Sequence, residues 1–338
     1  MSDMIAISPI TEEKKYQKMT GKAAVVLVTD ENYFLPTFAA ALSADAHTER
    51  ATSIYLFVVN ADEAWLQQFG TAVSGTKISI RPASFPQLAE FSRFHRDAVP
   101  PIALARLWIG SLLEEDIERF LYIDGDTMVD DELESLLAIS PPEDGLMAVP
   151  DFMRIYIDEL SLSKRRDIAN LRDLGCSPTA YFNSGVIYAS KNAWNSIASS
   201  AVRFLREHPD RCIASDQSAL NHAAQGNVDF LSLRYNYQSE YMMALDPREL
   251  GFKPTIWHFV GAPKPWDAPG WPWDEYFNKF YRKAESLLRN CSVTLPVPPK
   301  AQIVAGLSHR KRNRFRLKWV YPWRRYTRKR KVLSLLLQ

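Results

Sequence analysis

The chain has 338 residues, of which 46% are hydrophobic and 24% charged, enough for a sizeable core in one large domain or two smaller ones. Aromatic residues make up 12% and only 13 residues are glycine, which argues against a disordered or repetitive chain. The formal net charge of +2 hides an asymmetry. Residues 309–338 hold 12 Lys and Arg and no acid, whereas the rest of the chain holds 29 Lys and Arg against 39 Asp and Glu.

The cysteines and the N-terminus indicate the cellular compartment. Cys176, Cys212 and Cys291 are scattered and form no Cys-x-x-Cys pair, which favours free thiols in a reducing compartment and no zinc site. Residues 1–20 form a polar lead-in without the apolar core of a signal peptide, and no apolar run approaches transmembrane length. We therefore expect a cytoplasmic protein.

Strand-like and helix-like patterns alternate over the first 130 residues. Residues 22–30, KAAVVLVTD, form the continuous apolar run that is typical of a strand buried on both faces. Further strands are predicted over 53–60, 77–83 and 119–126, and helices over 31–45, 61–69 and 100–116. This alternation predicts parallel βαβ units and an open α/β sheet.

The second half of the chain is less regular. Strands are predicted over 146–151, 180–190, 228–238 and 254–261, and helices over 191–208, 215–226 and 273–290. A Pro-containing linker over 293–308 then separates a catalytic body, 21–292, from a basic and aromatic tail, 309–338.

Two carboxylates one residue apart end the strand predicted over 119–126. Asp124 and Asp126 follow the apolar run RFLYI, and open α/β sheets bind ligands at the carboxyl ends of their strands. The period of two along a strand points both carboxylates to the same side, where they suit a hard divalent cation shared with a diphosphate. The alternative is a solvated turn, because Asp and Gly both favour turns.

A histidine and a lysine follow another apolar strand far downstream. In WHFVGAPKPW, residues 257–266, His258 ends the strand, and Gly261 and Lys264 come three and six residues later. A Gly-Ala-Pro turn brings backbone N–H groups close to phosphate, and lysine binds phosphate as a point charge. An imidazole joined to two carboxylates shifts the metal preference towards Mn²⁺. The alternative for His258 is a purely structural role.

Polar residues also follow the first strand. Asp30, Asn32 and Tyr33 lie at the sheet edge predicted for Asp124, and an aromatic ring beside amide and carboxylate groups suits a nucleobase. The alternative is a helix N-cap by Asp30, with Tyr33 as a packing residue.

Two more polar positions lie in the second half. Asn183 stands in the middle of the strand predicted over 180–190, an unusual place for an amide unless a polar group meets it. Asp216 and Gln217 open a helix, where the alternative is a favourable charge at a helix start.

Taken together, these motifs resemble family 8 of the glycosyltransferases, which includes bacterial lipopolysaccharide galactosyl- and glucosyltransferases and the glycogenins. From about residue 23 to 285 the order is Asp-x-Asn-Tyr, Ala-Arg-Leu, Tyr-x-Asp-x-Asp, Phe-Asn-x-Gly, Asp-Gln-x-x-Leu-Asn and His-x-x-Gly-x-x-Lys-Pro-Trp. The resemblance implies the GT-A fold, an α/β fold with a Rossmann-like mixed sheet, flanking helices and a smaller acceptor-side subregion. It also implies a UDP-glucose or UDP-galactose donor, Mn²⁺ or Mg²⁺, and transfer with retention to a glycan or glycolipid acceptor.

The resemblance assigns roles to the residues that match the family's motifs. The residues that match the metal ligands are Asp124, Asp126 and His258. Those that match contacts to uridine, donor sugar and diphosphate are Asp30, Asn32, Tyr33, Arg106, Asp151, Gly261 and Lys264. Those that match positions lining the transferred sugar, and are therefore the catalytic candidates, are Asn183, Asp216 and Gln217.

The route of a retaining transfer stays open between two mechanisms. One uses a carboxylate nucleophile such as Asp216, and the other attacks from the front face, with a diphosphate oxygen helping to deprotonate the acceptor. Gln217 matches the position nearest the face that a nucleophile would use, and an amide is a poor nucleophile, which favours front-face transfer. Residues 152–179 match no motif, so donor sugar and acceptor are not assigned.

Two other functions are compatible with parts of the pattern. One is a metal-dependent nucleotide-sugar hydrolase or nucleotidyltransferase, although the first strand lacks the Gly-rich phosphate loop expected of a nucleotidyltransferase. The other is a non-catalytic glycan- and membrane-binding module, against which the intact metal and phosphate positions argue.

The tail over 309–338 interleaves Lys and Arg with aromatic and apolar residues. These are Phe315, Leu317, Trp319, Val320, Tyr321, Trp323 and Tyr326. Such a stretch is typical of an anionic membrane interface; the alternatives are nucleic-acid binding by stacking and a solvated disordered tail. The final VLSLLL and the acidic body favour the membrane over nucleic acid. We expect peripheral attachment to the inner face of the cell membrane, which fits an acceptor such as lipopolysaccharide core, and no nucleic-acid partner.

Overall fold

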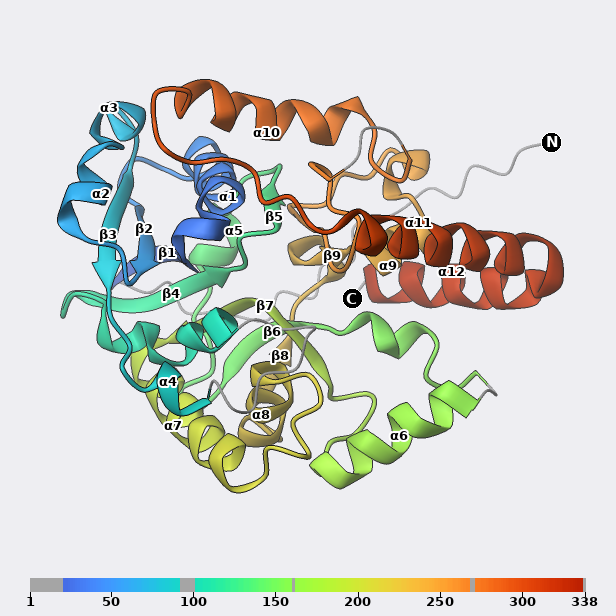
Figure 1. The fold of residues 1–338 in the computed structure, drawn as a ribbon. Helices are drawn as coiled ribbons and strands as arrows, with labels where there is room; N and C mark the ends of the chain where they lie inside the picture. Colours follow the sequence, from blue (N-terminus) through green and yellow to red (C-terminus); the bar gives the residue numbers. More distant parts are fainter. Residues whose placement is uncertain (1–20, 92–100, 160–161, 268–270, 337–338) are drawn as a thin grey trace.

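Seven strands form the main sheet of the computed structural model, in the order β3-β2-β1-β4-β7-β6-β8 (Figure 1). The structure describes residues 21–91, 101–159, 162–267 and 271–336, so the polar lead-in predicted for residues 1–20 lies outside the described residues. A second sheet of three strands, in the order β5-β10-β9, lies beside the first. The α/β class with a mixed sheet agrees with the sequence-based prediction.

The strands are β1 (Lys22–Thr29), β2 (Ser53–Val59), β3 (Ile78–Ala83), β4 (Ile117–Ile123), β5 (Thr127–Val129), β6 (Leu146–Pro150), β7 (Phe182–Ser190), β8 (Val228–Phe230), β9 (Tyr237–Gln238) and β10 (Ile256–His258). The α-helices are α1 (Phe34–Ala46), α2 (Glu63–Gln67), α3 (Gly70–Val73), α4 (Leu88–Phe91), α5 (Glu134–Leu137), α6 (Leu162–Leu174), α7 (Lys191–Glu207), α8 (Asp216–Ala223), α9 (Ser239–Ala244), α10 (Glu275–Leu287), α11 (Lys300–Phe315) and α12 (Pro322–Leu336). Short 3₁₀ segments are η1 (Glu31–Tyr33), η3 (Pro101–Ser111), η4 (Phe152–Ile155), η5 (Leu233–Tyr235) and η6 (Pro247–Leu250), and η7 (Arg316–Val320) is a π-helical turn.

Four sequence-based predictions need correction. The strand predicted over 228–238 is interrupted by η5 and becomes β8 and β9, which belong to different sheets. The helix predicted over 100–116 is the 3₁₀ segment η3. The helix predicted over 61–69 is shorter, because α2 ends at Gln67, and the separate helix α3 begins only at Gly70. The predicted linker over 293–308 is non-helical only as far as residue 299, because α11 begins at Lys300.

Strand direction sets which residues meet at one edge of the main sheet. Strands β1, β2, β3 and β4 run parallel to one another, as the βαβ pattern predicts. Strand β7 runs antiparallel to both of its neighbours, β4 and β6. Its first residues therefore lie at the edge where β1, β4 and β6 end. We call this edge the carboxyl edge.

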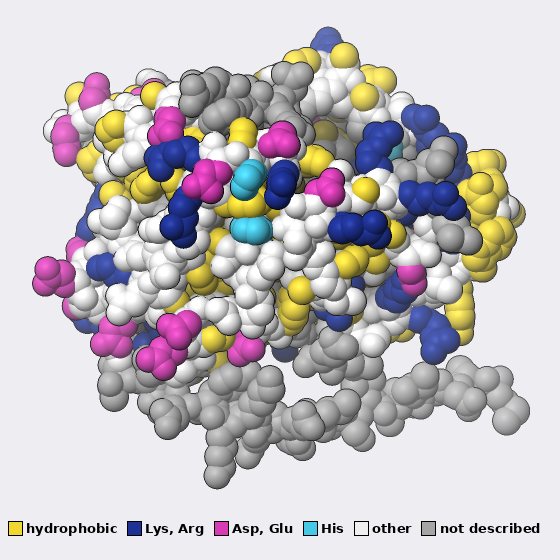
Figure 2. Space-filling view, turned by 90° about the horizontal axis from the view of Figure 1, so that it is seen from below, with side chains coloured by type: hydrophobic (Ala, Val, Ile, Leu, Met, Phe, Trp, Pro, Cys, Tyr) yellow, Lys and Arg dark blue, Asp and Glu magenta, His cyan; other side chains and the backbone are white. Residues whose placement is uncertain are grey.

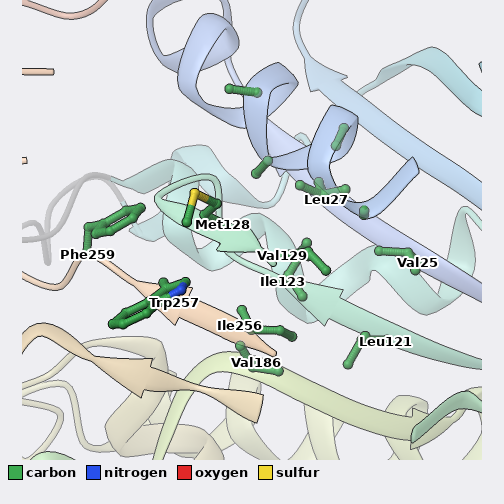
Figure 3. Packing of buried hydrophobic residues seen from close by; sticks show 14 of the residues in the cluster. Val25, Leu27, Leu121, Ile123, Met128, Val129, Val186, Ile256, Trp257 and Phe259 are labelled. Atoms are coloured by element: carbon green, nitrogen blue, oxygen red, sulfur yellow. The ribbon is translucent and has the colours of Figure 1, made fainter. Parts of the chain in front are cut away.

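Both faces of the main sheet are buried, which explains the unbroken apolar run of β1. Val25 and Leu27 of β1 point into one core, which also takes in α1, α10 and the small sheet. Ala24 and Val26 point into the other core, against η3, α7 and α8. Figure 3 shows the first core, where Leu121 and Ile123 of β4 lie near Ile256 and Val129 of the small sheet.

The C-terminal basic segment is helical and docks on the body. Helices α11 and α12, joined by η7, form the antiparallel pair that we call the C-terminal hairpin, residues 300–336 (Figure 1). Val332 is fully buried and Leu335 is 7% exposed, and burial of such side chains stabilises a fold by about 1.5–3 kcal/mol each. The Glu159 carboxylate accepts two hydrogen bonds from Arg328, and Ser232 donates one to the carbonyl of Leu336. Among the described helices, none combines the length and the apolarity that crossing a membrane demands.

Candidate active site at the carboxyl edge

Three strands of the main sheet end in an aspartate at the carboxyl edge. Asp30 follows β1, Asp124 follows β4, and Asp151 follows β6. The antiparallel strand β7 begins at the same edge and contributes Asn183 as its second residue. Sheet topology therefore gathers polar side chains from four strands at the place where open α/β sheets bind ligands.

Asp124, Asp126 and His258 converge at this edge. One ligand atom from each of the three lies within 4.8 Å of the other two. The His258 Nε2 atom is 3.8 Å from Asp124 Oδ2 and 3.3 Å from Asp126 Oδ1. The predicted convergence is confirmed, but its expected cause is corrected. Both aspartates lie in the turn between β4 and β5, so the turn, not a strand's period of two, brings them together.

The small sheet explains why a histidine 132 positions after Asp126 reaches the turn. Strand β5 starts immediately after the turn and pairs antiparallel with β10, with Thr127 opposite His258. The Phe259 N–H donates to the carbonyl of Asp126 at 2.9 Å, which extends the pairing by one residue. The imidazole is therefore placed beside the carboxylates by backbone hydrogen bonds.

Each carboxylate divides its two oxygens between the protein and the centre of the site. Asp124 Oδ1 accepts from Arg106 at 3.0 Å and from the Tyr122 hydroxyl at 2.6 Å, which leaves Oδ2 facing the imidazole. Asp126 Oδ2 contacts the Lys264 ammonium at 2.5 Å, which leaves Oδ1 facing the imidazole. Two carboxylate oxygens and Nε2 thus share one small volume, and a borderline-hard divalent ion such as Mn²⁺ suits this donor set.

A second set of residues orients the imidazole. His258 Nδ1 is 2.9 Å from Asn236 Oδ1, which acts as the acceptor because the Asn236 amide NH₂ donates to Asn183 Oδ1 at 2.9 Å. Nδ1 therefore carries the proton, and Nε2 presents its lone pair to the site. Metal-binding histidines are commonly held in this way by an acceptor on the other ring nitrogen. Asn236 is fully buried, so its geometry is fixed by packing.

Gly185 closes the site because no side chain fits there. A Cβ atom added at Gly185 would lie 2.2 Å from His258 Cε1 and 2.7 Å from Asp124 Oδ2. Both contacts are far inside van der Waals distance, and neither partner is the free end of a flexible side chain. The Gly185 carbonyl also accepts from the Asp124 N–H at 2.8 Å. The glycine in the motif FNSG is thus required by the metal ligands across the strand.

Charge pairing keeps this buried site ionised. Burial opposes ionisation of Asp126, but the Lys264 ammonium outweighs it and holds the pKa of that carboxyl well below its usual range. Burial also opposes the charge of Arg106, and here the carboxylates of Asp124 and Asp216 outweigh it and raise the pKa of the guanidinium. Arg106 is 7% exposed and bridges two aspartates, with its Nε 3.1 Å from Asp216 Oδ2.

A hydrogen-bonded cluster adjoins the metal candidates. Gln217 donates to Asp151 at 3.2 Å and accepts from the Asn183 amide and the Ser184 N–H, each at 3.1 Å. Asp151 is 3% exposed, and burial raises the pKa of its carboxyl. The three predicted sugar-lining residues, Asn183, Asp216 and Gln217, thus meet on one side of the site, and Asn183 in its strand is explained by these partners.

The residues expected to bind uridine lie at the end of β1. Asp30 accepts a hydrogen bond from the Tyr33 N–H at 2.9 Å and caps η1, so the capping alternative describes its local contact. Tyr33 packs edge-to-face on Trp266 with ring centroids 5.8 Å apart, and Asn32 is exposed. Thr37 of α1 lies close to the turn between β4 and β5. A Cβ atom added at Gly125 in that turn would lie 2.2 Å from the Thr37 hydroxyl oxygen. The uridine role of the three residues remains a prediction.

The predicted phosphate loop lies directly over the metal candidates. Gly261 has a positive φ of 71°, a backbone conformation that favours glycine. Lys264 curls back so that its ammonium donates to Phe259 O at 2.6 Å as well as contacting Asp126. The lysine is therefore anchored at the site by two short contacts.

Sequence reasoning missed several supporting residues. Asn236, Tyr122, Ser184 and Gly185 hold the ligands or leave room for them. Gly185 belongs to the motif FNSG, and Tyr122 lies two residues before Asp124, so both were within reach of the sequence pattern. Asn236 carried no signal, because it follows the short segment η5 and meets His258 only in the folded chain.

Comparison with known proteins places this geometry in context. Residues 24–270 match the family described as glycosyl transferase family 8. General stress protein A of Bacillus subtilis is 30% identical over 195 residues, which cover 52% of this chain and 63% of that protein. Lipopolysaccharide 1,3-galactosyltransferase of Salmonella typhimurium is 25% identical over 202 residues, 57% of each. The chain spans about six tenths of the length of the curated relatives it matches.

Solved structures show the same fold. The galactosyltransferase LgtC, in complex with donor and acceptor sugar analogues, aligns with a TM-score of 0.61 at 21% identity, over 82% of this chain and 98% of that one. The glycosyltransferase GlyE of Streptococcus pneumoniae aligns with a TM-score of 0.53 at 18% identity, over 80% of this chain and 62% of that one. At these identities the likeness shows the fold alone, and it is the predicted GT-A fold.

Proposed function

The chain belongs to glycosyltransferase family 8, and from that membership we propose that it is a retaining hexosyltransferase. It moves glucose or galactose from a UDP-sugar to a glycan acceptor and depends on Mn²⁺, with Mg²⁺ as the weaker substitute. A lipopolysaccharide or another surface glycan is the proposed acceptor. The relative named lipopolysaccharide 1,3-galactosyltransferase supports that choice.

One observation carries the proposal: Asp124, Asp126 and His258 present three ligand atoms within 4.8 Å of one another. The free oxygens, the oriented Nε2 and the space that only Gly185 leaves all fit a single divalent cation. Bound there, the cation supplies Lewis-acid stabilisation of the charge that develops on the leaving diphosphate.

The chain's own cations complete that stabilisation. Lys264 contacts Oδ2 of Asp126, the oxygen that does not face the imidazole. From there its ammonium is placed to contact a diphosphate oxygen. Arg106 stays locked between Asp124 and Asp216, so it orients the carboxylates rather than the substrate. Preorganised charges of this kind are worth more in a buried site than in water, because the surrounding dielectric is low.

The surroundings of Asp216 support front-face transfer. Its carboxylate is 3% exposed and already paired with Arg106 and with the Ser184 hydroxyl, which makes it a poor nucleophile. Gln217 has both ends of its amide engaged. In the proposed step the C1–O bond to UDP breaks and the acceptor oxygen bonds C1 on the same face. The acceptor's proton passes to a diphosphate oxygen, so UDP leaves with that proton.

Release of UDP tests the proposal. The full chain is assayed with UDP-glucose and UDP-galactose, with Mn²⁺ or with EDTA, in the presence and absence of lipopolysaccharide core acceptors. We expect metal-dependent release that requires the acceptor. Release without acceptor would indicate a nucleotide-sugar hydrolase, and no release with either donor would indicate a binding module. Trapping a glycosyl adduct on Asp216 would exclude the front-face route.

We also propose that the C-terminal hairpin attaches the protein to the inner face of the cell membrane. Large apolar side chains are exposed at its turn, including Phe315 at 59%, Trp319 at 66% and Trp323 at 59%. Figure 2 shows hydrophobic side chains gathered at the right edge of the molecule, where the far end of the hairpin lies, with Lys and Arg beside them. Aromatic rings flanked by cations suit the interface of an anionic bilayer.

Sedimentation with vesicles tests the membrane proposal. The full chain should sediment with phosphatidylglycerol vesicles at low salt, and Trp319→Ala combined with Trp323→Ala should reduce the bound fraction. Phosphatidylcholine vesicles are the control. Equal sedimentation of the double variant would contradict a role for the hairpin's aromatic side chains, and sedimentation with neither vesicle would contradict attachment altogether.

A further inference from the structure

A pocket of about 580 Å³ lies between the C-terminal hairpin and the segment that follows β6. Its volume is within the usual range of ligand sites. One wall contains Phe152, Tyr156 and Glu159, and another contains Arg310, Arg316 and other hairpin residues. In Figure 1 the segment after β6 runs beside α12, in agreement with the ion pairs between them.

One residue that lines the pocket, Phe152, is the chain neighbour of a candidate active-site residue. Phe152 directly follows Asp151, and its N–H donates to Gln238, which pairs with His258 across the small sheet. Glu240 lies two residues beyond Gln238 and is close enough to Asp151 for their charges to interact. The end of the pocket at Phe152 therefore lies next to Asp151 of the candidate active site.

The pocket carries an excess of positive charge. It is lined by Lys164, Arg310, Arg314, Arg316, Arg324 and Arg328. The carboxylates that line it are Glu159 and Glu240. Glu159 is neutralised by Arg324 and Arg328, and burial raises the pKa of Glu240. Burial and the Arg312, Arg310 and Arg316 cations lower the pKa of His309, which reports the same positive field.

Three of these arginines are available for a ligand's charge. Arg310 is 5% exposed, and although it donates to the carbonyls of Val260 and Ala262, its Nη1 has no hydrogen-bond partner. Arg314 and Arg316 are exposed and have no carboxylate within ion-pair distance among the described residues. A buried guanidinium with an unused donor is costly unless a ligand satisfies it.

We propose that this pocket is the acceptor site and that it selects a saccharide bearing a phosphate group. The proposal rests on the proposed function and specifies its acceptor. The rings of Phe152, Tyr156 and Tyr321 supply apolar surface for the sugar, while Arg314 and Arg316 hold the phosphate at the hairpin end. The acceptor hydroxyl then points inward, past Phe152, to the donor sugar. The family match ends at residue 270, so the phosphate-binding wall is a feature of this chain beyond the family domain.

Calorimetric titration of the full chain, loaded with Mn²⁺ and UDP, tests whether the pocket selects a phosphorylated saccharide. The probes are glucose, galactose and mannose 6-phosphates, the three parent hexoses, and inorganic phosphate. We expect at least one hexose phosphate to bind about tenfold or more tightly than both its hexose and inorganic phosphate, since charge-assisted hydrogen bonds add to the contacts of the sugar. Arg314→Gln combined with Arg316→Gln should abolish this preference.

A matched variant controls for overall charge. Arg325→Gln combined with Arg330→Gln removes two exposed cations from the same hairpin, neither of which lines the pocket. It should leave the preference within about twofold. The inference is overturned if no hexose phosphate is preferred, if inorganic phosphate binds as tightly, or if both double variants behave alike. Failure of UDP to bind with Mn²⁺ in the loading step would instead contradict the proposed function. Failure of the acceptor proposal and failure of the proposed function are therefore distinguishable.

Discussion

The carboxyl edge and the C-terminal hairpin both concentrate charged side chains. These charges are mostly paired and buried at the carboxyl edge, and mostly exposed to solvent on the hairpin. At the carboxyl edge Asp124, Asp126 and Asp216 have fixed partners of opposite charge, and Arg106 by itself binds two of them, at 3.0 and 3.1 Å. On the hairpin most cations face solvent, and Glu159 is the carboxylate that gathers Arg324 and Arg328. Burial explains the difference, because an unpaired charge is tolerable in water and very costly in a core.

The comparison teaches where a substitution will act. Removing a charge at the carboxyl edge leaves its partners unpaired in a low dielectric, so chemistry and metal binding should suffer strongly and salt should matter little. Removing a charge from the hairpin changes a screened surface field, so the effects should be smaller and should depend on salt.

The largest effect is expected for Asp126→Asn. The change removes one metal ligand and the partner of Lys264, and we expect turnover to fall on the order of 10³-fold. Steady-state UDP release at saturating Mn²⁺ measures it. Asp131→Asn, which alters an exposed pair with Arg234, should remain within about twofold. Activity of Asp126→Asn within fivefold of the unmodified chain would argue that the turn does not hold the metal.

Gly185→Ala tests how tightly the site is enclosed. The new methyl group would press on the His258 ring and on Asp124, so we expect Mn²⁺ affinity to fall about 10–100-fold while the chain still folds. Mn²⁺ binding is measured by electron paramagnetic resonance. Gly70→Ala is the matched control, because nothing lies within 4 Å of a Cβ at that position. An unchanged Mn²⁺ affinity would show that the space between Gly185, His258 and Asp124 is larger than the distances indicate.

Glu159→Gln tests the nearly buried carboxylate that pairs with two arginines of the hairpin. Its oxygens accept from Arg328, and the loss of this charge should lower the free energy of unfolding by about 1–2 kcal/mol. Urea denaturation measures the change. Asp158→Asn, at a side chain that is 67% exposed, should cost less than about 0.5 kcal/mol and should lose even that at high salt. Equal effects of the two variants would count against docking through Glu159.

The smallest effect is expected for Glu240→Gln, at a residue between the carboxyl edge and the C-terminal hairpin. Because burial raises the pKa of Glu240 in the folded state, the folded state holds the proton more tightly than the unfolded state does. Wild-type stability therefore decreases as pH rises from the unfolded pKa to the folded pKa. Glu240→Gln does not titrate, so its stability relative to wild type should improve from pH 5 to pH 8.

Urea denaturation in EDTA at the two pH values checks this last prediction. The exposed Glu249→Gln serves as the control and should show a difference that does not change with pH. If Glu240→Gln loses stability relative to wild type as pH rises, the carboxylate is stabilised as an ion in the fold, and it then reduces the excess of positive charge in the pocket.

Local patterns in the sequence predicted most of the first half of the fold. The unbroken apolar run of β1 predicted a strand buried on both faces, and Val25 and Ala24 do point into different cores. Pro36 lies in the first turn of α1, where it is tolerated. The strand predicted over 228–238 was wrong, because its apolar residues are divided between two sheets by η5, and no local pattern records which neighbours a strand will find.

The sequence by itself determined which residues are the metal candidates at the carboxyl edge. Residue types and the order of motifs were enough to single out Asp124, Asp126 and His258, since together they match the motifs of one family. Only the tertiary structure decided how these groups are held. Asn236 sets the protonated nitrogen of His258, and Gly185 leaves the room for its ring. Tertiary packing alone also placed part of the basic, aromatic tail against the body, where it forms a pocket wall opposite Phe152. Such contacts join residues far apart in the chain, and they depend on burial and on pairing across sheets, which no local pattern of residues encodes.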